Sequence, residues 1–205
     1  LLGEIMATRS KKKSNGLKIL TGMKPYLHIA IWKLMYDNFK ISYDSFCEKE
    51  GTREDLRLKR TEAVKNLEKT DENTLSLIST VSKAIQIEVD KKETKYKEFF
   101  PEGTLKTATE GNKIDRILSL EQLLKGFENN KNYEFYAKYN QQLITAKAKL
   151  EEEYDIVNKV TQKEKEAINV LKDEENKYDF AYRKVKHFVK DEVNPNEYPN
   201  FFDEW

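Results

Sequence analysis

Two acidic residues, Asp71 and Glu175, stand inside apolar helical patterns and are the first candidates for chemistry in this sequence. Each occupies a position at which a repeat in steps of three and four residues would otherwise place a core side chain. A bundle that brought both carboxylates to one level could use them to share a proton or to bind a divalent metal, because like charges at short range cannot both stay ionised without a cation. The alternative is a polar layer that sets the register of the helices or meets lysine and water at the bundle edge.

The two histidines give this metal hypothesis no support. Di-iron bundles use Glu-x-x-His motifs, but Pro25 and Lys184 stand three residues before His28 and His187. His28 lies next to an apolar face and His187 lies among lysines, as ordinary surface residues do. The sequence also lacks a glycine-rich phosphate loop, an H-E-x-x-H motif and a G-x-S-x-G turn. We therefore predict no catalytic residue and no cofactor.

Lysines gather near the start of the sequence. Residues 1–25 contain Lys11, Lys12 and Lys13, and Glu4 is their only acidic residue. Glycines and a proline interrupt this segment, so we predict a flexible basic arm over residues 1–25. Three adjacent lysines could contact nucleic acid or an anionic membrane with modest, salt-sensitive affinity, or the arm could be a solvated tail.

A second candidate for nucleic-acid binding is aromatic. Tyr133, Tyr136 and Tyr139 recur every three residues beside Lys131 and Lys138, a combination on which single-stranded nucleic acid could stack. The competing interpretation is that Tyr133 and Tyr136 close the end of a helical core while Tyr139 reaches water.

Composition favours long, solvated helices over a sheet. The 205 residues are 38% hydrophobic and 36% charged, and they include only 7 glycines and 4 prolines. The net charge of +1 gives the molecule as a whole no field that would attract DNA or a membrane. We expect no membrane span, because no apolar run reaches 18 residues. The single cysteine, Cys47, excludes an internal disulfide and fits the cytoplasm, the compartment that we predict.

Apolar spacing predicts about four helices, two of them long, in an all-α antiparallel up-down bundle. We expect breaks at Gly51, where Thr52 and Asp55 resemble a helix start, and in the turn of residues 101–111. The expected helices cover residues 26–51, 52–100, 113–127 and 131–190. The last is the simplest interpretation of a stretch without glycine or proline, although Thr161 and Glu164 also resemble a helix start.

The sequence contains a suggested internal repeat. A shift of 104 residues superimposes Val64 on Ile168, Leu67 on Leu171 and Asp71 on Glu175. Both copies end on the pattern Y-x-x-F-F, at residues 96–100 and 198–202. We interpret this as duplication of a helical hairpin, with halves at 26–103 and 113–193, although two generic heptad patterns would also align.

The predicted tail, residues 194–205, is rich in aromatic and acidic residues. We expect Phe201 and Phe202 to dock onto the bundle, as Phe99 and Phe100 should at the equivalent place. The rival is an exposed anchor for another protein.

The segment Phe99-Phe100-Pro101-Glu102-Gly103, followed by a short helix and then a long one, resembles uncharacterised all-helical bacterial proteins of the Bacteroidetes type. These carry an aromatic-Pro-x-Gly turn between two helical halves. The resemblance implies the helical architecture and assigns no functional residue.

Three functional hypotheses follow. The first is a non-enzymatic bundle whose helical surfaces bind the protein itself or other proteins. The second is a nucleic-acid-associated protein that uses Lys11, Lys12 and Lys13. The third is a carboxylate-based metal-binding protein centred on Asp71 and Glu175.

Overall fold

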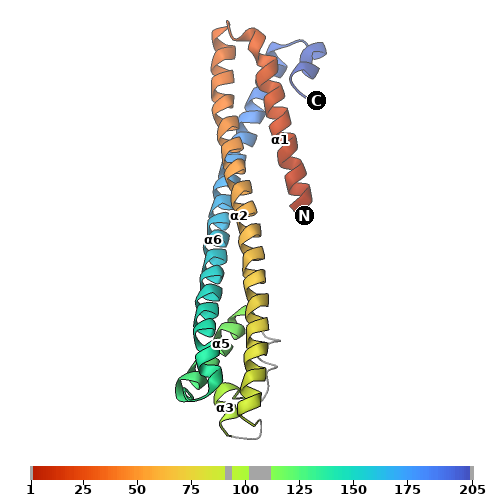
Figure 1. The fold of residues 1–205 in the computed structure, drawn as a ribbon. Helices are drawn as coiled ribbons and strands as arrows, with labels where there is room; N and C mark the ends of the chain where they lie inside the picture. Colours follow the sequence, from red (N-terminus) through yellow and green to blue (C-terminus); the bar gives the residue numbers. More distant parts are fainter. Residues whose placement is uncertain (1, 91–93, 102–111, 204–205) are drawn as a thin grey trace. The chain divides into compact units, whose positions relative to one another are not determined.

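The computed structural model describes residues 2–90, 94–101 and 112–203 (Figure 1). All regular elements in these residues are helical, which confirms the all-α prediction. The α-helices are α1 (Leu2–Met23), α2 (Ala30–Glu88), α3 (Tyr96–Phe99), α5 (Lys113–Asn129) and α6 (Glu134–Glu192), and the 3-10 helices are η1 (Lys24–Tyr26) and η2 (Pro195–Asn200). No helix in these ranges is long and apolar enough to cross a membrane.

Both long helices have 59 residues. α6 is the single helix predicted over residues 131–190, without a break at Thr161. The predicted break at Gly51 is wrong, because α2 continues through it. The Thr52 hydroxyl donates to the carbonyl oxygen of Glu48 at 3.0 Å, a bond inside the helix, so it does not cap a new one. A glycine inside a helix costs only about 0.5–1 kcal/mol relative to alanine, which packing on both sides of Gly51 outweighs.

The chain forms two compact units, and they are not the predicted halves 26–103 and 113–193. Unit 1 contains Leu1–Arg57 and Lys163–Trp205, and unit 2 contains Leu58–Gln162. α2 and α6 pack antiparallel, so each unit combines the first half of one long helix with the second half of the other. In unit 1, Ser45 of α2 donates to Glu174 of α6 at 2.8 Å, whereas in unit 2 Glu88 of α2 accepts from the backbone N–H of Glu134, which begins α6, at 3.1 Å.

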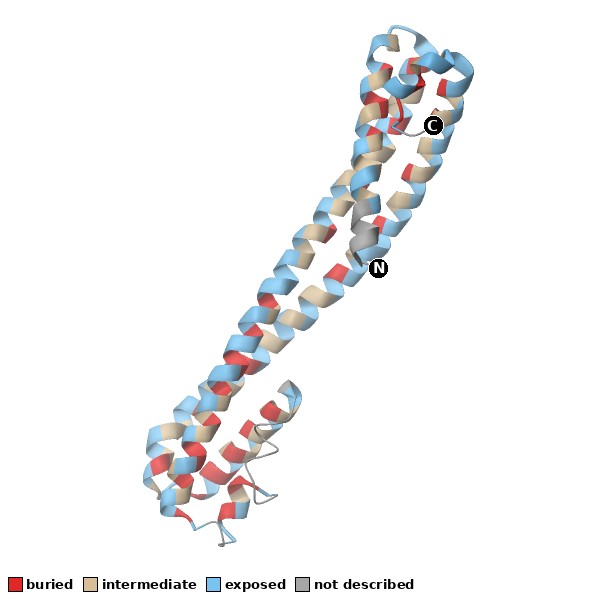
Figure 2. Ribbon diagram, turned by 90° about the vertical axis from the view of Figure 1, so that its right-hand side faces the viewer, coloured by how far each residue is buried: buried red, intermediate tan, exposed pale blue. Residues whose placement is uncertain are grey.

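Unit 2 is completed by α5, which begins at a capping box. The Asn112 side chain accepts from the backbone N–H groups of Ile114 and Asp115, and the Asp115 carboxylate accepts from the N–H of Asn112. Figure 2 shows buried residues recurring along the helices between exposed ones. The core of this unit joins α2, α3, α5 and α6 through Ile78, Val81, Ile85, Tyr96, Phe99, Leu120, Leu123, Phe127, Leu143 and Leu150, among others.

Unit 1 is completed by α1, in the segment predicted to be a flexible arm. The prediction is wrong because Ile19, Leu20 and Met23 are buried and bring the helix onto the bundle. The predicted tail also packs here: Phe201 and Phe202 are buried, and the Tyr198 hydroxyl donates to the carbonyl oxygen of Lys190 at 3.0 Å. Phe99 and Phe100 are likewise buried in unit 2. Residues 102–111 of the predicted turn, and Trp205 of the tail, lie outside the described residues.

The shift of 104 residues relates further features of the fold, in addition to the apolar heptad patterns. Adding 104 to the bounds of α2, 30 and 88, gives 134 and 192, the bounds of α6. The same shift takes Gly22 of α1 to Gly126 of α5. A Cβ on Gly22 would lie 2.8 Å from Cδ1 of Phe201, and one on Gly126 would lie 2.6 Å from Cδ1 of Phe99. The two glycines therefore make the same close approach to the ring of a Y-x-x-F-F segment.

Candidate interaction grooves and the polar contacts beside them

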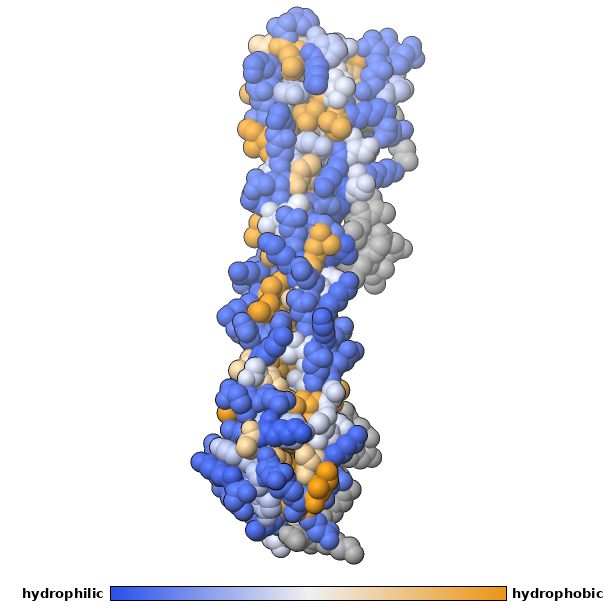
Figure 3. All heavy atoms as spheres, viewed as in Figure 1, coloured by the Kyte–Doolittle hydropathy of each residue, from blue (hydrophilic) through white to orange (hydrophobic). Residues whose placement is uncertain are grey.

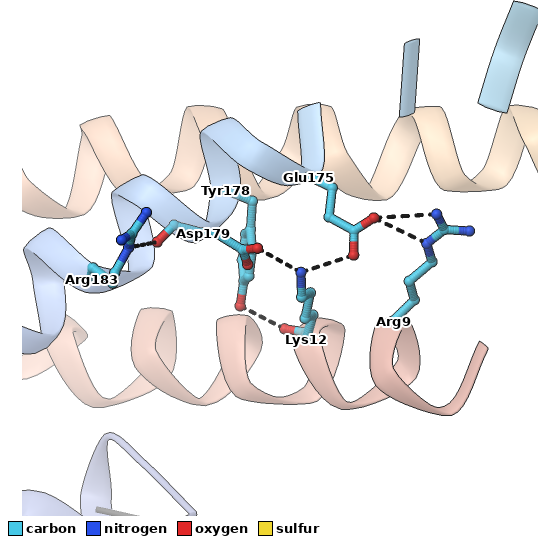
Figure 4. A network of polar contacts seen from close by, with 6 residues as sticks. All are labelled: Arg9, Lys12, Glu175, Tyr178, Asp179 and Arg183. Atoms are coloured by element: carbon cyan, nitrogen blue, oxygen red, sulfur yellow. Dashed lines mark hydrogen bonds and ion pairs between the residues drawn. The ribbon is translucent and has the colours of Figure 1, made fainter. Parts of the chain in front are cut away.

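Basic residues of α1 meet acidic residues of α6 in a polar network in unit 1 (Figure 4). The Lys12 Nζ atom lies 2.8 Å from Glu175 Oε1 and 2.8 Å from Asp179 Oδ2. The Arg9 Nη2 atom lies 3.2 Å from the other oxygen of Glu175. The Tyr178 hydroxyl donates to the carbonyl oxygen of Lys12 at 2.8 Å. These contacts hold α1 against α6 along one face.

The network changes the pKa values of its members. Burial alone would raise the pKa of Glu175, but the hydrogen bond from Lys12 and the charges of Lys12 and Arg9 outweigh it, so this pKa is lowered. Burial alone would lower the pKa of Lys12, but hydrogen bonds and charge from Asp179 and Glu175 raise it. Burial also raises the pKa of Tyr178 well above its usual range. All three groups therefore keep their ordinary charge states at neutral pH, as expected for a clamp between helices.

This geometry corrects the hypothesis of a basic patch at Lys11, Lys12 and Lys13. Arg9, Lys12 and Lys13 fall on one side of a helix because they are three and four residues apart. Lys12 pairs with Glu175 and Asp179, and Lys13 pairs with Glu50. Lys11 is exposed and also has an interaction within the protein. The charge that was predicted to bind phosphates is largely used to dock α1.

The two candidate metal ligands, Asp71 and Glu175, belong to different units, and each finds its counter-charge within its own unit. The Asp71 carboxylate accepts from both Nε and Nη2 of Arg116, the latter at 2.7 Å. Asp71 is 8% exposed and Arg116 6%, so this is a buried, bidentate ion pair. Each of the two carboxylates is therefore engaged by basic side chains of its own unit. No group of three His, Cys, Asp or Glu side chains that could hold a metal occurs among the described residues.

The tyrosines of the predicted stacking surface pack at the start of α6. The Tyr133 ring stacks on Phe135, with centroids 5.1 Å apart, and Tyr136 lies 6.2 Å from Phe127. Tyr139 is half-buried against the same core. The positions of Tyr133 and Tyr136 fit the interpretation that these two rings close the end of the core.

His28 and His187 are both exposed.

A groove that the sequence did not predict opens between α2 and α6 in unit 1. It has a volume of about 500 Å³, and its walls include Asn38 and Ser42 of α2 and Phe180, Ala181 and Lys184 of α6. Phe180 is 56% exposed, which is unusual for so large an apolar ring. The Lys184 Nζ atom lies 4.5 Å from the centre of this ring. Figure 3 shows scattered apolar patches on a largely hydrophilic surface.

Unit 2 has a groove of about 360 Å³ at equivalent positions. Adding 104 to Asn38 and Ser42 gives Gln142 and Ala146, and subtracting 104 from Ala181 gives Leu77; all three line the second groove. Its walls differ in character, because threonine, asparagine and glutamine predominate and no aromatic residue is present among the described lining residues. The signal available in the sequence was an apolar residue off the heptad seam, such as Phe180.

No protein-family model matches the chain, and neither the curated proteins nor the solved structures contain one that is significantly similar to it.

Proposed function

We propose that this protein is a non-enzymatic interaction protein that receives a helix of a partner in the open groove between α2 and α6. The observation that carries the proposal is that both units have a groove at equivalent positions, between the same two helices. A groove between two neighbouring helices has the dimensions and the apolar floor that an amphipathic helix recognises.

The covering of each unit supports this proposal. In unit 1, α1 contacts α6 through Glu175, Tyr178 and Asp179, whereas the groove is lined by Lys177, Phe180 and Lys184. One stripe of α6 is therefore occupied by α1, and another stripe stays open. Packing a further helix there would complete a four-helix arrangement, the common way in which helical seams are buried.

Internal duplication is part of the same proposal. The 104-residue shift relates the bounds of α2 and α6, Gly22 and Gly126, and the ion pairs Lys12–Glu175 and Arg116–Asp71. A generic heptad does not specify a close-packed glycine or the sign of a buried pair, so these features favour duplication over coincidence. Each unit would then be assembled from pieces of both copies. The proposal also includes a cytoplasmic location, which suits the single Cys47, and a bacterial origin.

The test is a selection of displayed amphipathic helical peptides on the full-length protein. Enriched peptides are measured against Ala181→Arg and Ala146→Arg, which fill the two grooves, and against Asn176→Arg and Ala148→Arg, which add the same side chain at exposed positions outside them. We expect binding to fall at least about tenfold with one groove variant and to stay unchanged with both controls.

Because Ala181 is half-buried, its replacement could disturb the fold. Phe180→Ser is the second variant, since it removes an exposed ring and should leave the melting temperature unchanged. Enriched peptides that ignore both groove variants and Phe180→Ser, or a selection that enriches no peptide, would overturn the proposal.

A further inference from the structure

We infer that the groove of unit 1 selects an acidic amphipathic helix of a partner protein, and that Phe180, Lys177 and Lys184 provide the selection. This inference rests on the proposed function and adds the chemistry of the partner. It concerns unit 1 because only that groove combines an exposed aromatic ring with two cationic side chains among its described lining residues.

The charge of the groove has one sign. Of the described residues that line it, Lys177 and Lys184 are the charged ones, and both extend from the same face of α6. The nearest carboxylate with a defined contact is Glu174, which accepts from the Ser45 hydroxyl at 2.8 Å and from Lys177 at 2.6 Å. These hydrogen bonds, first that from Lys177 and then that from Ser45, lower the pKa of Glu174. Glu174 therefore offsets much of the charge of Lys177, and Lys184, whose Nζ atom lies over the Phe180 ring, supplies most of the positive charge of the groove.

The floor of the groove is apolar and closed. Phe39 and Val185 are each 1% exposed, and they form a base that belongs to the core of the unit. Phe180 stands beside this base with more than half of its surface in water. An aliphatic or aromatic side chain of a partner would cover both the base and the ring, and such buried anchors dominate the energy of helical interfaces.

Lys184 lies over the Phe180 ring, so the positive charge of the groove stands next to its apolar surface. The ammonium group, 4.5 Å from the ring centre, stays next to the apolar anchor position instead of extending freely into solvent. A carboxylate one helical turn away from the anchor of the partner would then meet Lys184 directly. Glutamate or aspartate three or four residues from a large apolar residue is therefore the sequence signature that this groove favours.

Unit 2 provides the internal contrast. At its equivalent groove, Asn73 stands where unit 1 has Lys177, and Thr80 and Ser76 stand at the positions that correspond to Lys184 and Phe180. Lys149 is the charged residue among the described lining residues there. The two grooves lie at corresponding positions of their units, but they differ in the residues that would discriminate between partners by charge.

The experiment uses two synthetic helical peptides of equal length and identical apolar seam, one with glutamates and one with lysines flanking the seam. Each is titrated against the full-length protein by fluorescence anisotropy at low and moderate salt. We expect the acidic peptide to bind at least about tenfold more tightly than the basic one, with the difference shrinking as salt rises. Phe180→Ser should weaken both peptides, whereas Lys177→Gln with Lys184→Gln should remove most of the preference.

The outcomes separate this inference from the proposed function. If both peptides bind with equal affinity, or the basic one more tightly, and Phe180→Ser still weakens binding, groove recognition survives and acidic selection is overturned. If the acidic preference persists in the double lysine variant, the inference is likewise wrong. If neither peptide binds, the inference is wrong, and the displayed-peptide selection alone then decides the proposed function.

Discussion

α1 and α5 occupy equivalent places in the two units and are held there by different means. α5 buries Leu120, Leu123 and Phe127, and its Arg116 makes a buried bidentate pair with Asp71. Among the side chains of α1 that the structure describes, the buried apolar ones, Ile19, Leu20 and Met23, lie near its carboxyl end. Its preceding turns are held by Arg9, Lys12 and Lys13, through partly exposed ion pairs.

The comparison shows how ion pairs at corresponding positions can contribute very different amounts of stability. A shift of 104 residues relates Lys12 to Arg116 and Glu175 to Asp71. In unit 2 the pair is shielded from water, so loss of Asp71 breaks a buried, bidentate ion pair. In unit 1 the side chains of Lys12 and Glu175 are 20% and 19% exposed, and water can replace the lost contact. We therefore expect α5 to be an integral part of its unit and α1 to be the more easily released helix.

The largest expected effect is that of Asp71→Ala, which should lower the free energy of unfolding by about 3–5 kcal/mol because it breaks a buried, bidentate ion pair with Arg116. Glu175→Ala should cost about 1 kcal/mol or less. Urea unfolding of both full-length variants measures the difference. The double variant Asp71→Leu, Arg116→Met should recover most of the loss, and similar costs for the two single variants would break the comparison.

The packing glycines should behave alike in both units. Gly126→Ala would bring a Cβ within 2.9 Å of the carbonyl oxygen of Glu98, and Gly22→Ala would bring one within 2.7 Å of that of Asn200. Because backbone atoms must move in each case, we expect each variant to lose about 1–3 kcal/mol of stability. Thermal or urea denaturation tests this, and a neutral Gly22→Ala beside a damaging Gly126→Ala would argue against equivalent packing.

Acid should release α1 before α5. The pKa of Glu175 is lowered from the usual 4.5, so its stabilising contribution is complete above pH 4.5 and is lost as the pH falls toward the lowered value. Hydrogen exchange at decreasing pH, corrected for the intrinsic rate, should show loss of protection in α1 first. High salt near neutral pH should act in the same direction. Equal loss in both helices would contradict the distinction.

The smallest expected effect is that of Gly51→Ala, which serves as a reference for the variants of the two packed glycines. In the described structure, a Cβ on Gly51 would meet no atom within 4 Å, so Gly51→Ala gains helix propensity without a clash. We expect α2 to become more stable by about 0.5–1 kcal/mol. A destabilised Gly51→Ala would mean that this part of α2 departs from a regular helix.

The parts of the fold that depend on local pattern were predictable. The absence of glycine and proline over residues 131–190 was sufficient to predict α6 as one helix, and the Y-x-x-F-F endings were sufficient to expect buried Phe99 and Phe201. Gly51 was misjudged because helix propensity is a weak term when both sides of a helix are packed. The apolar pattern does not predict burial at every position, since Ile168 is 40% exposed.

The remaining features depend on contacts between residues far apart in the sequence. No residue close to Lys12 in the sequence reveals that Glu175 is its partner. Residues 1–25 were therefore predicted to be a flexible arm. Arg116 and Asp71 are separated in the same way, so the sequence did not reveal that an arginine meets Asp71. The grooves were missed because they are formed by residues beside the heptad seams, such as Phe180, whose exposure only the packing of two helices determines.

The most direct test of the central claim, that the open face of unit 1 receives a partner helix, is site-specific photocrosslinking. A photoreactive phenylalanine analogue is placed at Phe180 in the full-length protein, and at the exposed Lys172 as a control outside the groove. With a selected acidic peptide present, we predict a crosslink from position 180 and none from position 172, and competition by the unlabelled peptide. A crosslink at both positions, or only at position 172, would contradict the account.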